Sequence, residues 1–490
     1  MTIPTLPPRL GAATAALREQ PIPVTEKGFG VLASRGTVTA ASLGSQRPSL
    51  FGDGITTPVL VLRESAVASN VAAMAAYCEA AQVRLAPHGK TTMAPQLFAR
   101  QLAAGAWAIT AATISQVQVY RAFGVPRVLL ANELTDTAGA AWLARELAAD
   151  PGFDCYAYVD SVPGVRLLDE AMREGGQGRP LPVLVELGHP GGRTGCRDIA
   201  DATAIAQAVG EAPSLRLAGA AGFEGSIGHD GSPATPAAVA RYCRELRSLG
   251  ELLARSAPGE LILTAGGSMF FDIVAQELTA GWAGRPPTVV LRSGVYIAFD
   301  HGIYAQMAPG GGQPPRRQPR AALAAGQNAA GQSAAGQSAA GQDAAGPNAA
   351  GRDAGRTGVA KPDAAGPGEA APGAPALKPA LELWAHVLSR PEPTLALACA
   401  GRRDVSFDAG LPVPLKTRHR GGAVHLATGM QAVRLDDQHC YLMVPTGTDL
   451  APGDLICLGI SHPCTTFDKW RVIPVVDDDY RVVDAIHTFF

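Results

Sequence analysis

Short apolar runs alternate with segments of helical length through much of this chain, and this alternation restricts the possible fold more than any other feature. Eight such runs are separated mostly by Ala- and Leu-rich stretches that suit helices. This pattern predicts an α/β protein built on a closed parallel (β/α)8 barrel of the TIM type. A doubly wound open sheet is the alternative, but the strand count and the segment length favour the barrel. The expected strands are 83–86, 106–110, 127–131, 154–159, 181–186, 215–222, 261–265 and 288–291.

The chain divides around this pattern. Residues 1–56 are rich in Pro, Ala, Gly and Ser and are expected to be partly irregular and to pack on a C-terminal β domain. The barrel domain is expected over 57–308, with a further strand at 57–62 ahead of the eight. From 377 to 490 short strands with turn signals predict an all-β domain. Its expected strands are 381–388, 394–398, 423–427, 431–435, 441–445, 454–458 and 470–476.

Residues 309–376 form a low-complexity insert between these domains. They contain Ala-Ala-Gly-Gln repeats, as in residues 325–332, and continue with Ala, Gly, Pro and scattered charge. Such a composition buries too little apolar surface to offset its ordering entropy. We therefore expect the insert to be disordered.

Charge and composition exclude several classes of partner. The formal net charge of -2 gives no electrostatic case for nucleic acid or an anionic membrane. No apolar run is long enough to span a bilayer, and the first residues lack a secretory signal pattern. The eight cysteines include no Cys-x-x-Cys pair, which favours reduced thiols. These features predict a cytoplasmic protein that acts on a small molecule.

Lys90 is the candidate nucleophile. It follows the 83–86 strand after a break at Pro87, so it would lie at the mouth of the sheet. An amine in a partly desolvated pocket has a lowered pKa and can attack carbonyl carbons, as a Schiff-base lysine must. For a lone lysine, a surface position in a turn is the commoner case.

The other unusual motifs also follow strands. In a parallel barrel the loops after the C-terminal strand ends meet on one face, where active sites form. Glu224 and His229 could titrate in the same cleft or remain solvated loop residues. The motifs are the glycine-rich loop around Arg193, Glu224 with His229, Gly266-Gly267-Ser268, and Arg292-Ser293-Gly294-Val295-Tyr296.

Two of these motifs suit anions. Gly266, Gly267 and Ser268 can expose consecutive backbone N–H groups to a phosphate, although an ordinary turn is the commoner interpretation. Arg193 could hold a phenolate or a carboxylate through its fork of donors, or it could be a surface arginine in a flexible loop.

His462 and Cys464 are a candidate metal pair in the β domain. An imidazole and a thiolate two residues apart can bind one metal ion, and the soft sulfur favours zinc. Two protein ligands leave positions open for water or substrate, as a catalytic metal requires. On spacing alone, a buried cysteine near a turn histidine is the commoner case.

In chain order, these motifs resemble those of the alanine-racemase-like, fold type III pyridoxal-phosphate enzymes. More closely, they resemble the branch that holds D-serine dehydratases and D-threonine aldolases. The resemblance covers nearly all of Thr57 to Phe490 apart from the insert. It rests on Pro87-His88-Gly89-Lys90-Thr91, Arg193-Thr194-Gly195, Ala265-Gly266-Gly267-Ser268 and Gly294-Val295-Tyr296.

The resemblance implies a cofactor, pyridoxal 5'-phosphate, and roles for these residues. Lys90 would be catalytic and bound to the cofactor aldehyde, and Arg193 would face the ring hydroxyl. The chain departs from its relatives at 188–190, where an acidic residue is usual, and in 222–229, where a tyrosine is not evident. Ser293 also replaces the more usual proline, so the ring-nitrogen partner and the substrate pocket stay open. The remaining cofactor contacts would be His88, Gly266, Gly267, Ser268 and Tyr296.

The resemblance also implies a reaction. In relatives the position of His462 and Cys464 carries a His-x-Cys or a His-x-Asp pair, and His-x-Cys is associated with zinc-dependent D-serine dehydratase. We therefore expect a dehydratase that uses pyridoxal 5'-phosphate and Zn²⁺ to convert D-serine-like β-hydroxy amino acids into a 2-keto acid and ammonia. The alternatives are a metal-dependent D-threonine-type aldolase and a pyridoxal-phosphate carrier without turnover. The expected partners are the D-amino acid substrate and a second copy of the chain in a homodimer.

Overall fold

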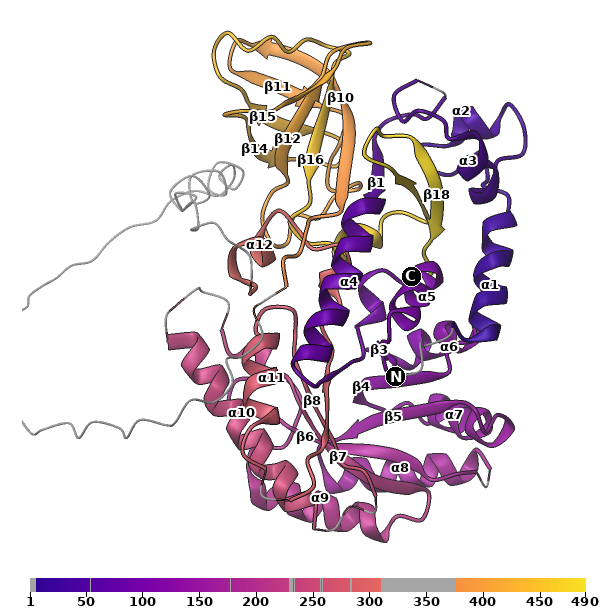
Figure 1. Ribbon diagram of the computed structural model, residues 1–490, viewed down its shortest axis with the longest axis vertical. Helices are drawn as coiled ribbons and strands as arrows, with labels where there is room; N and C mark the ends of the chain where they lie inside the picture. The colour runs from indigo at the N-terminus through magenta and orange to yellow at the C-terminus, as the bar shows by residue number, and fades with distance from the viewer. Residues whose placement is uncertain are drawn as a thin grey trace, which may run out of the picture. The chain divides into compact units, whose positions relative to one another are not determined.

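The computed structural model describes residues 6–52, 54–176, 178–228, 232, 234–255, 257, 259–282, 284–309, 373 and 375–490 (Figure 1). These residues fall within one unit of the chain. The predicted insert at 309–376 lies almost wholly outside the described residues.

Eight parallel strands form a barrel in the order β2-β9-β8-β7-β6-β5-β4-β3. The two ends of this sheet meet, because His88 and Thr110 form a parallel bridge. Beside it, the Trp107 N–H donates to the Leu85 carbonyl at 2.6 Å. The predicted barrel is therefore confirmed over the open sheet. The strands are β2 (Arg84–Leu85), β3 (Ile109–Ala111), β4 (Arg127–Glu133), β5 (Asp154–Val159), β6 (Leu181–Leu187), β7 (Leu215–Gly222), β8 (Ile262–Ala265) and β9 (Thr288–Leu291).

Helices connect these strands and cover their outer side (Figure 1). Several begin at a Thr, Asp or Ser whose side chain accepts a backbone N–H of the first turn, as at Thr113, Asp136 and Ser161. Within the described residues no helix is long and apolar enough to cross a bilayer. The helices are α4 (Glu64–Ala80), α5 (Pro95–Ala103), α6 (Ile114–Ala122), α7 (Thr137–Ala149), α8 (Val162–Glu174), α9 (Ile199–Glu211), α10 (Ala234–Leu253) and α11 (Phe271–Thr279).

A second, ten-stranded sheet contains the C-terminal strands and one strand from the N-terminal part. Its main path is β13-β12-β16-β10-β1-β17-β18, and β11, β14 and β15 extend it beside β10. The strands are β1 (Val59–Arg63), β10 (Leu381–Glu392), β11 (Leu395–Ala398), β12 (Val413–Arg418), β13 (Val424–Leu426), β14 (Gln431–Leu435), β15 (Cys440–Met443), β16 (Leu455–Gly459), β17 (Val472–Val476) and β18 (Val482–His487).

Strand β1 lies within the range predicted for the barrel domain but belongs to the second sheet. It pairs antiparallel with β10 and parallel with β17 in the second sheet. Val59 to Leu62 are all buried, and a continuous apolar run suits any strand that is covered on both faces. The pattern could therefore predict a strand here, but not the sheet to which it belongs.

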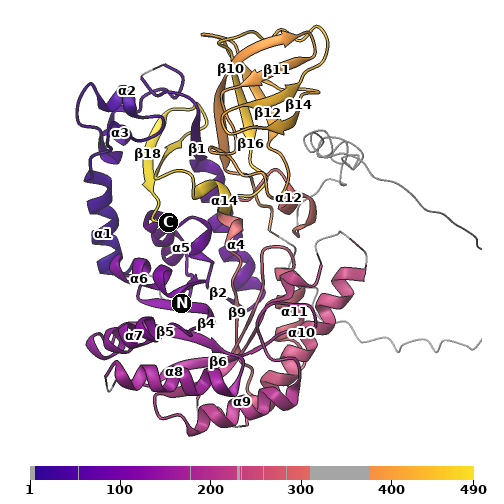
Figure 2. The ribbon, with the colours of Figure 1, turned by 180° about the vertical axis from the view of Figure 1, so that it is seen from behind.

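The N-terminal residues contain more helix than expected. They form α1 (Pro8–Glu19), α2 (Gly30–Ala33) and α3 (Ala40–Gln46). Helices α1 and α3 contact β18, a strand that the sequence reading did not include (Figure 2). Short elements of mixed polarity give a weak periodic signal, which explains both omissions.

Candidate active site

Lys90 lies at the C-terminal end of the barrel. It is in the 3-10 turn η1 (Gly89–Thr91), five residues beyond the end of β2 in the chain. The turn packs so closely that a Cβ on Gly89 would lie 2.6 Å from the Tyr120 hydroxyl. Burial lowers the pKa of the Lys90 amine, while the charge of Cys464 acts in the opposite direction. This is the partly desolvated amine that the sequence predicts.

Two arginines add positive charge around Lys90. Arg292 is buried and donates to the Thr264 hydroxyl at 2.8 Å and to the Gly222 carbonyl at 2.6 Å. The guanidinium of Arg193 lies 4.2 Å from the centre of the Phe223 ring. Both arginines lower the Lys90 pKa further, after burial. Arg193 is therefore close enough to Lys90 to influence its charge, and its role with a cofactor stays a prediction.

His88 lies in the same cationic surroundings. Burial holds the pKa of its imidazole well below the usual value, and the charges of Lys90 and Arg292 add to this effect. Its Nδ1 is buried without a hydrogen-bond partner among the described residues. A neutral imidazole with a free ring nitrogen beside the amine can therefore contact a polar ligand.

The Gly266–Gly267 loop does bind a carboxylate, but the carboxylate belongs to the protein itself. Glu224 is fully buried and accepts the N–H groups of Gly266 at 2.9 Å and Gly267 at 2.6 Å. Gly266 has a φ of +105°, which explains the need for glycine there. Because these two N–H groups already donate to Glu224, a phosphate at this loop would have to accept hydrogen bonds from Ser268 and the groups after it. Glu224 was only one of two titratable candidates in the sequence, and His229 lies outside the described residues.

We expect Glu224→Ala to lower the free energy of unfolding by about 2–4 kcal/mol, because two buried N–H groups lose charge-assisted hydrogen bonds. Urea denaturation of the protein without cofactor measures this. The exposed Glu174→Ala is the control and should change stability by less than about 0.5 kcal/mol. Equal stability of the two variants would show that Glu224 does not hold the loop.

Two carboxyl groups meet at the ends of β4 and β6. Burial and the neighbouring Glu186 raise the pKa of Glu133 to about 8. Both oxygens of Glu133 and the hydroxyl of Tyr158 are buried without a hydrogen-bond partner in the described structure. Asp160, at the end of β5, accepts the Gly195 N–H at 3.2 Å and so anchors the Arg193 loop. No local pattern marks this acidic cluster in the sequence, because its members lie on or directly after three different strands.

The raised pKa of Glu133 predicts a pH effect on folding. The folded chain holds one more proton than the unfolded chain between the unfolded pKa and about 8. The contribution of Glu133 to the free energy of unfolding therefore falls as the pH rises toward 8, by up to roughly 1.4 kcal/mol per pH unit. Glu133→Gln should remove this slope, so the variant gains stability over the wild type between pH 6 and about pH 8. Urea denaturation at a series of pH values measures it, and parallel curves for the two proteins would contradict it.

Tyr296 is not brought to Lys90 by any contact in the described structure. It lies in the turn η3 (Val295–Ile297), is 2% exposed, and its hydroxyl accepts from Gln101 of α5 at 3.1 Å. Burial raises the pKa of its phenol, so the hydroxyl stays protonated. This environment favours a core position under α5 over the predicted cofactor contact.

The candidate metal pair lies beside the lysine turn. His462 precedes the short helix α14 (Cys464–Phe467), which Cys464 begins, and the Cys464 thiol donates to the Thr91 hydroxyl at 3.5 Å. The imidazole Nδ1 of His462 lies 2.6 Å from a carboxylate oxygen of Asp408. Interaction with Cys464, followed by Asp408, raises the pKa of His462 to about 9. The structure thus brings Cys464 into contact with the residue that follows Lys90, and it places His462 beside Cys464.

The metal pair has no third protein ligand in the part of the chain that the structure describes. No group of three or more His, Cys, Asp or Glu side chains there is arranged to hold a metal ion. Two donors suit a catalytic ion with open positions better than a closed structural site. Whether a metal binds stays a prediction at this point.

Three groups near the metal pair were not among the sequence predictions, and they are Asp408, Asp300 and Tyr304. Burial raises the pKa of the Tyr304 phenol, and the charges of Cys464, Asp300 and Asp408 add to this effect. Asp300 is buried, its pKa is raised to about 6 by burial, and it accepts the Ala305 N–H at 2.9 Å. Asp300 and Tyr304 follow the Gly294 motif closely and could have been found there, but no local signal marks Asp408.

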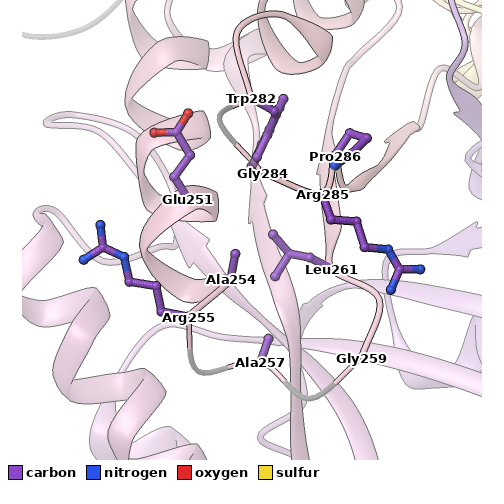
Figure 3. A pocket seen from close by; sticks show the side chains of 10 residues that line it. All are labelled: Glu251, Ala254, Arg255, Ala257, Gly259, Leu261, Trp282, Gly284, Arg285 and Pro286. Atoms are coloured by element: carbon purple, nitrogen blue, oxygen red, sulfur yellow. The ribbon is translucent and has the colours of Figure 1, made fainter.

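A separate pocket lies at the other end of the barrel (Figure 3). Leu261, directly before β8, lines it with Trp282 and residues from the end of α10. The Gly266 loop lies after β8, so this pocket and the lysine occupy opposite ends of the strands.

Comparisons with known proteins agree with this architecture. Residues 380–476 match the putative serine dehydratase domain. The chain is 30% identical to D-threonine aldolase from Arthrobacter sp over 233 residues, which are 46% of this chain and 60% of that protein. It is also 30% identical to D-threo-3-hydroxyaspartate dehydratase from Delftia sp. (strain HT23) over 250 residues, 50% of this chain and 61% of that protein. The matches therefore span less than two thirds of these curated relatives.

Solved structures share the fold over most of the chain. D-threonine aldolase from Filomicrobium marinum gives a TM-score of 0.65 at 24% identity and covers 89% of this chain and 95% of its own. An alanine-racemase-like protein from Idiomarina loihiensis gives a TM-score of 0.61 at 16% identity, covering 88% and 96%. The chain therefore has the fold of these solved structures, and its sequence is similar to a D-threonine aldolase and a D-threo-3-hydroxyaspartate dehydratase over about half of its length.

Proposed function

We propose that this protein is a pyridoxal 5'-phosphate- and zinc-dependent lyase that dehydrates D-amino acids bearing a β-hydroxyl group. The products would be a 2-keto acid and ammonia. The observation that carries the proposal is the contact between Cys464 and Thr91, which brings a metal-ligand pair to the residue next to Lys90. An amine and a metal pair at one site can act on the two adjacent carbons of a β-hydroxy amino acid.

The residues at the barrel mouth fit the proposed cofactor. His88 Nδ1, Arg292 Nε and the Tyr158 hydroxyl are buried polar atoms without hydrogen-bond partners in the described structure. Buried polar groups are nearly always paired, so these atoms favour a polar ligand at this place. Pyridoxal phosphate, when bound, supplies an electron sink for a carbanion at the substrate Cα. Lys90 would hold its aldehyde carbon, and Ser268 would contribute to the phosphate site.

Lys90 is also the proposed base. Burial and the neighbouring arginines lower the pKa of its amine, so more of it is neutral at physiological pH than for an exposed lysine. A neutral amine can accept the proton that leaves the substrate Cα. The positive charge of Arg193 and Arg292 at the same mouth would attract the substrate carboxylate.

His462 and Cys464 would hold the zinc ion. The thiolate is a soft ligand that favours zinc over magnesium or calcium. The described residues offer no third protein ligand, which leaves positions for a substrate oxygen. A zinc ion there would supply a Lewis acid for the departing β-hydroxyl. The His-x-Cys form of the pair favours elimination over aldol cleavage.

A D-threonine-type aldolase is the second candidate. The 30% identity to the Arthrobacter aldolase supports it, and the same lysine and metal pair could serve a cleavage of the Cα–Cβ bond. A pyridoxal-phosphate carrier without turnover is less favoured, because it would not need the metal-ligand candidate Cys464 in contact with the turn that contains Lys90. We further propose that the chain works as a homodimer in the cytoplasm, where its eight free cysteines would stay reduced.

A product assay tests the proposal. The full chain, supplied with pyridoxal phosphate and Zn²⁺, is incubated with D-serine, D-threonine and D-threo-3-hydroxyaspartate, with the L-isomers as controls. Ammonia together with a keto acid supports the dehydratase. Glycine together with an aldehyde would show instead that the protein is an aldolase. If none of these amino acids is converted, both proposed activities are refuted.

A further inference from the structure

We propose that Asp408 is a positioning residue that holds the His462 imidazole with its Nδ1–H toward the carboxylate, so that Nε2 is the metal-binding nitrogen. The inference rests on the proposed function, because it assigns a task within the proposed zinc site. Asp408 lies in the connection between β11 and β12, and its Oδ2 is 2.6 Å from His462 Nδ1. This distance is at the short end for a charge-assisted hydrogen bond.

The second oxygen of the same carboxylate is also used. Asp408 Oδ1 accepts the Thr465 hydroxyl at 2.7 Å. Thr465 directly follows Cys464, so one carboxylate contacts residues on both sides of the proposed sulfur ligand. A rotation of Asp408 away from His462 would therefore break two hydrogen bonds, which fixes the direction of the carboxylate.

The backbone around His462 is tied to the same connection. The His462 N–H donates to the Ser406 hydroxyl at 3.0 Å. The Ser406 N–H in turn donates to the Thr466 hydroxyl at 3.0 Å, and that hydroxyl donates to the His462 carbonyl at 3.1 Å. The two loops are thus joined through main-chain and side-chain groups, and the imidazole is oriented without any help from a metal.

The chemistry of imidazole gives this arrangement a consequence. A neutral imidazole carries its hydrogen on one nitrogen and a lone pair on the other, and an acceptor at Nδ1 places the hydrogen there. The lone pair of Nε2 is then available for a metal ion. Loss of such a carboxylate partner typically weakens metal binding by about 10–100-fold. A partly exposed ion pair with no task is the alternative, since the Asp408 side chain is 48% exposed.

Zinc binding by the full chain without pyridoxal phosphate tests the inference. The affinity for Zn²⁺ alone is measured by competition with a chromophoric chelator for the wild type, Asp408→Asn and Thr465→Val. We expect Asp408→Asn to bind Zn²⁺ about 10–100-fold more weakly and Thr465→Val to show a smaller loss. Co²⁺ in place of Zn²⁺ should keep its thiolate charge-transfer absorption in Asp408→Asn, because Cys464 remains. Asp449→Asn, whose side chain is 96% exposed, is the matched control and should bind like the wild type.

Each outcome separates this inference from the proposed function. If Asp408→Asn binds Zn²⁺ with an affinity within about threefold of that of the wild type, the inference is overturned. The proposed function would still stand if the wild type turns over its substrate and His462→Ala does not. A wild-type chain that binds no Zn²⁺ would overturn the inference and the metal part of the function together. Thermal unfolding without metal verifies that the variants fold. If Asp408→Asn does not fold, Thr465→Val decides, and wild-type affinity in that variant would overturn the inference.

Discussion

Lys90→Ala should abolish the visible absorption of the bound cofactor and lower the turnover of β-hydroxy D-amino acids by about 10⁴-fold. The loss is large because the same amine is proposed to hold the cofactor and to accept the Cα proton, and the loss of a catalytic base alone costs about 10²–10⁴ in rate. Its lowered pKa and its position at the barrel mouth support both tasks. Absorption spectra of the protein loaded with pyridoxal phosphate, followed by turnover assays, measure the two effects.

Lys378→Ala is the control for this experiment. Lys378 is exposed, and its hydrogen bonds to Asn70 use only its backbone groups, so the substitution should leave spectrum and turnover unchanged. Unfolding curves of Lys90→Ala should stay close to those of the wild type, since the half-buried Lys90 amine makes no hydrogen bond to any residue that the structure describes. A Lys90→Ala protein that keeps the absorption would refute the assignment of the lysine.

His462→Ala and Cys464→Ala should each remove bound zinc and lower turnover by about 10³-fold while the cofactor stays in place. The reason is that a site with two protein ligands keeps only one after either substitution, so the Lewis acid for the β-hydroxyl is lost. Metal analysis after dialysis, the cofactor absorption and the rate of ammonia release measure the three quantities.

His439→Ala is the control, because its side chain is an exposed imidazole in the same domain. It should keep zinc, cofactor and turnover. Full activity of the wild type after exhaustive chelation would contradict a metal role. Loss of the cofactor together with the metal would instead show that the pair acts as a structural support for the barrel mouth.

The barrel could be predicted because each of its strands leaves a local signal. A buried parallel strand is a short apolar run, and its connection is a helix with its own cap, so residues such as Asp136 and Ser161 mark the boundaries. The position of Lys90 followed from the same logic, since it comes directly after such a run. The metal pair was visible because His462 and Cys464 are neighbours in the sequence.

The rest of the site depends on contacts between distant segments. Asp408 reaches His462 across 54 residues, and Glu224 reaches Gly266 across 42. Each contact joins loops whose local sequence has no special pattern, so periodicity cannot reveal it. The direction of the Tyr296 side chain could not be predicted either, because a tyrosine after a strand can turn to the mouth or to the core, and only packing decides.

The placement of β1 has a consequence for how the polypeptide acquires its shape during synthesis. This strand lies between β10 and β17, so its second neighbour leaves the ribosome only when Val472–Val476 have been made. Until then one edge of β1 stays open beside a nearly finished barrel, and such an edge can pair with other chains. The free edge of β1 is therefore paired only after β17, near the other end of the sequence, has been made.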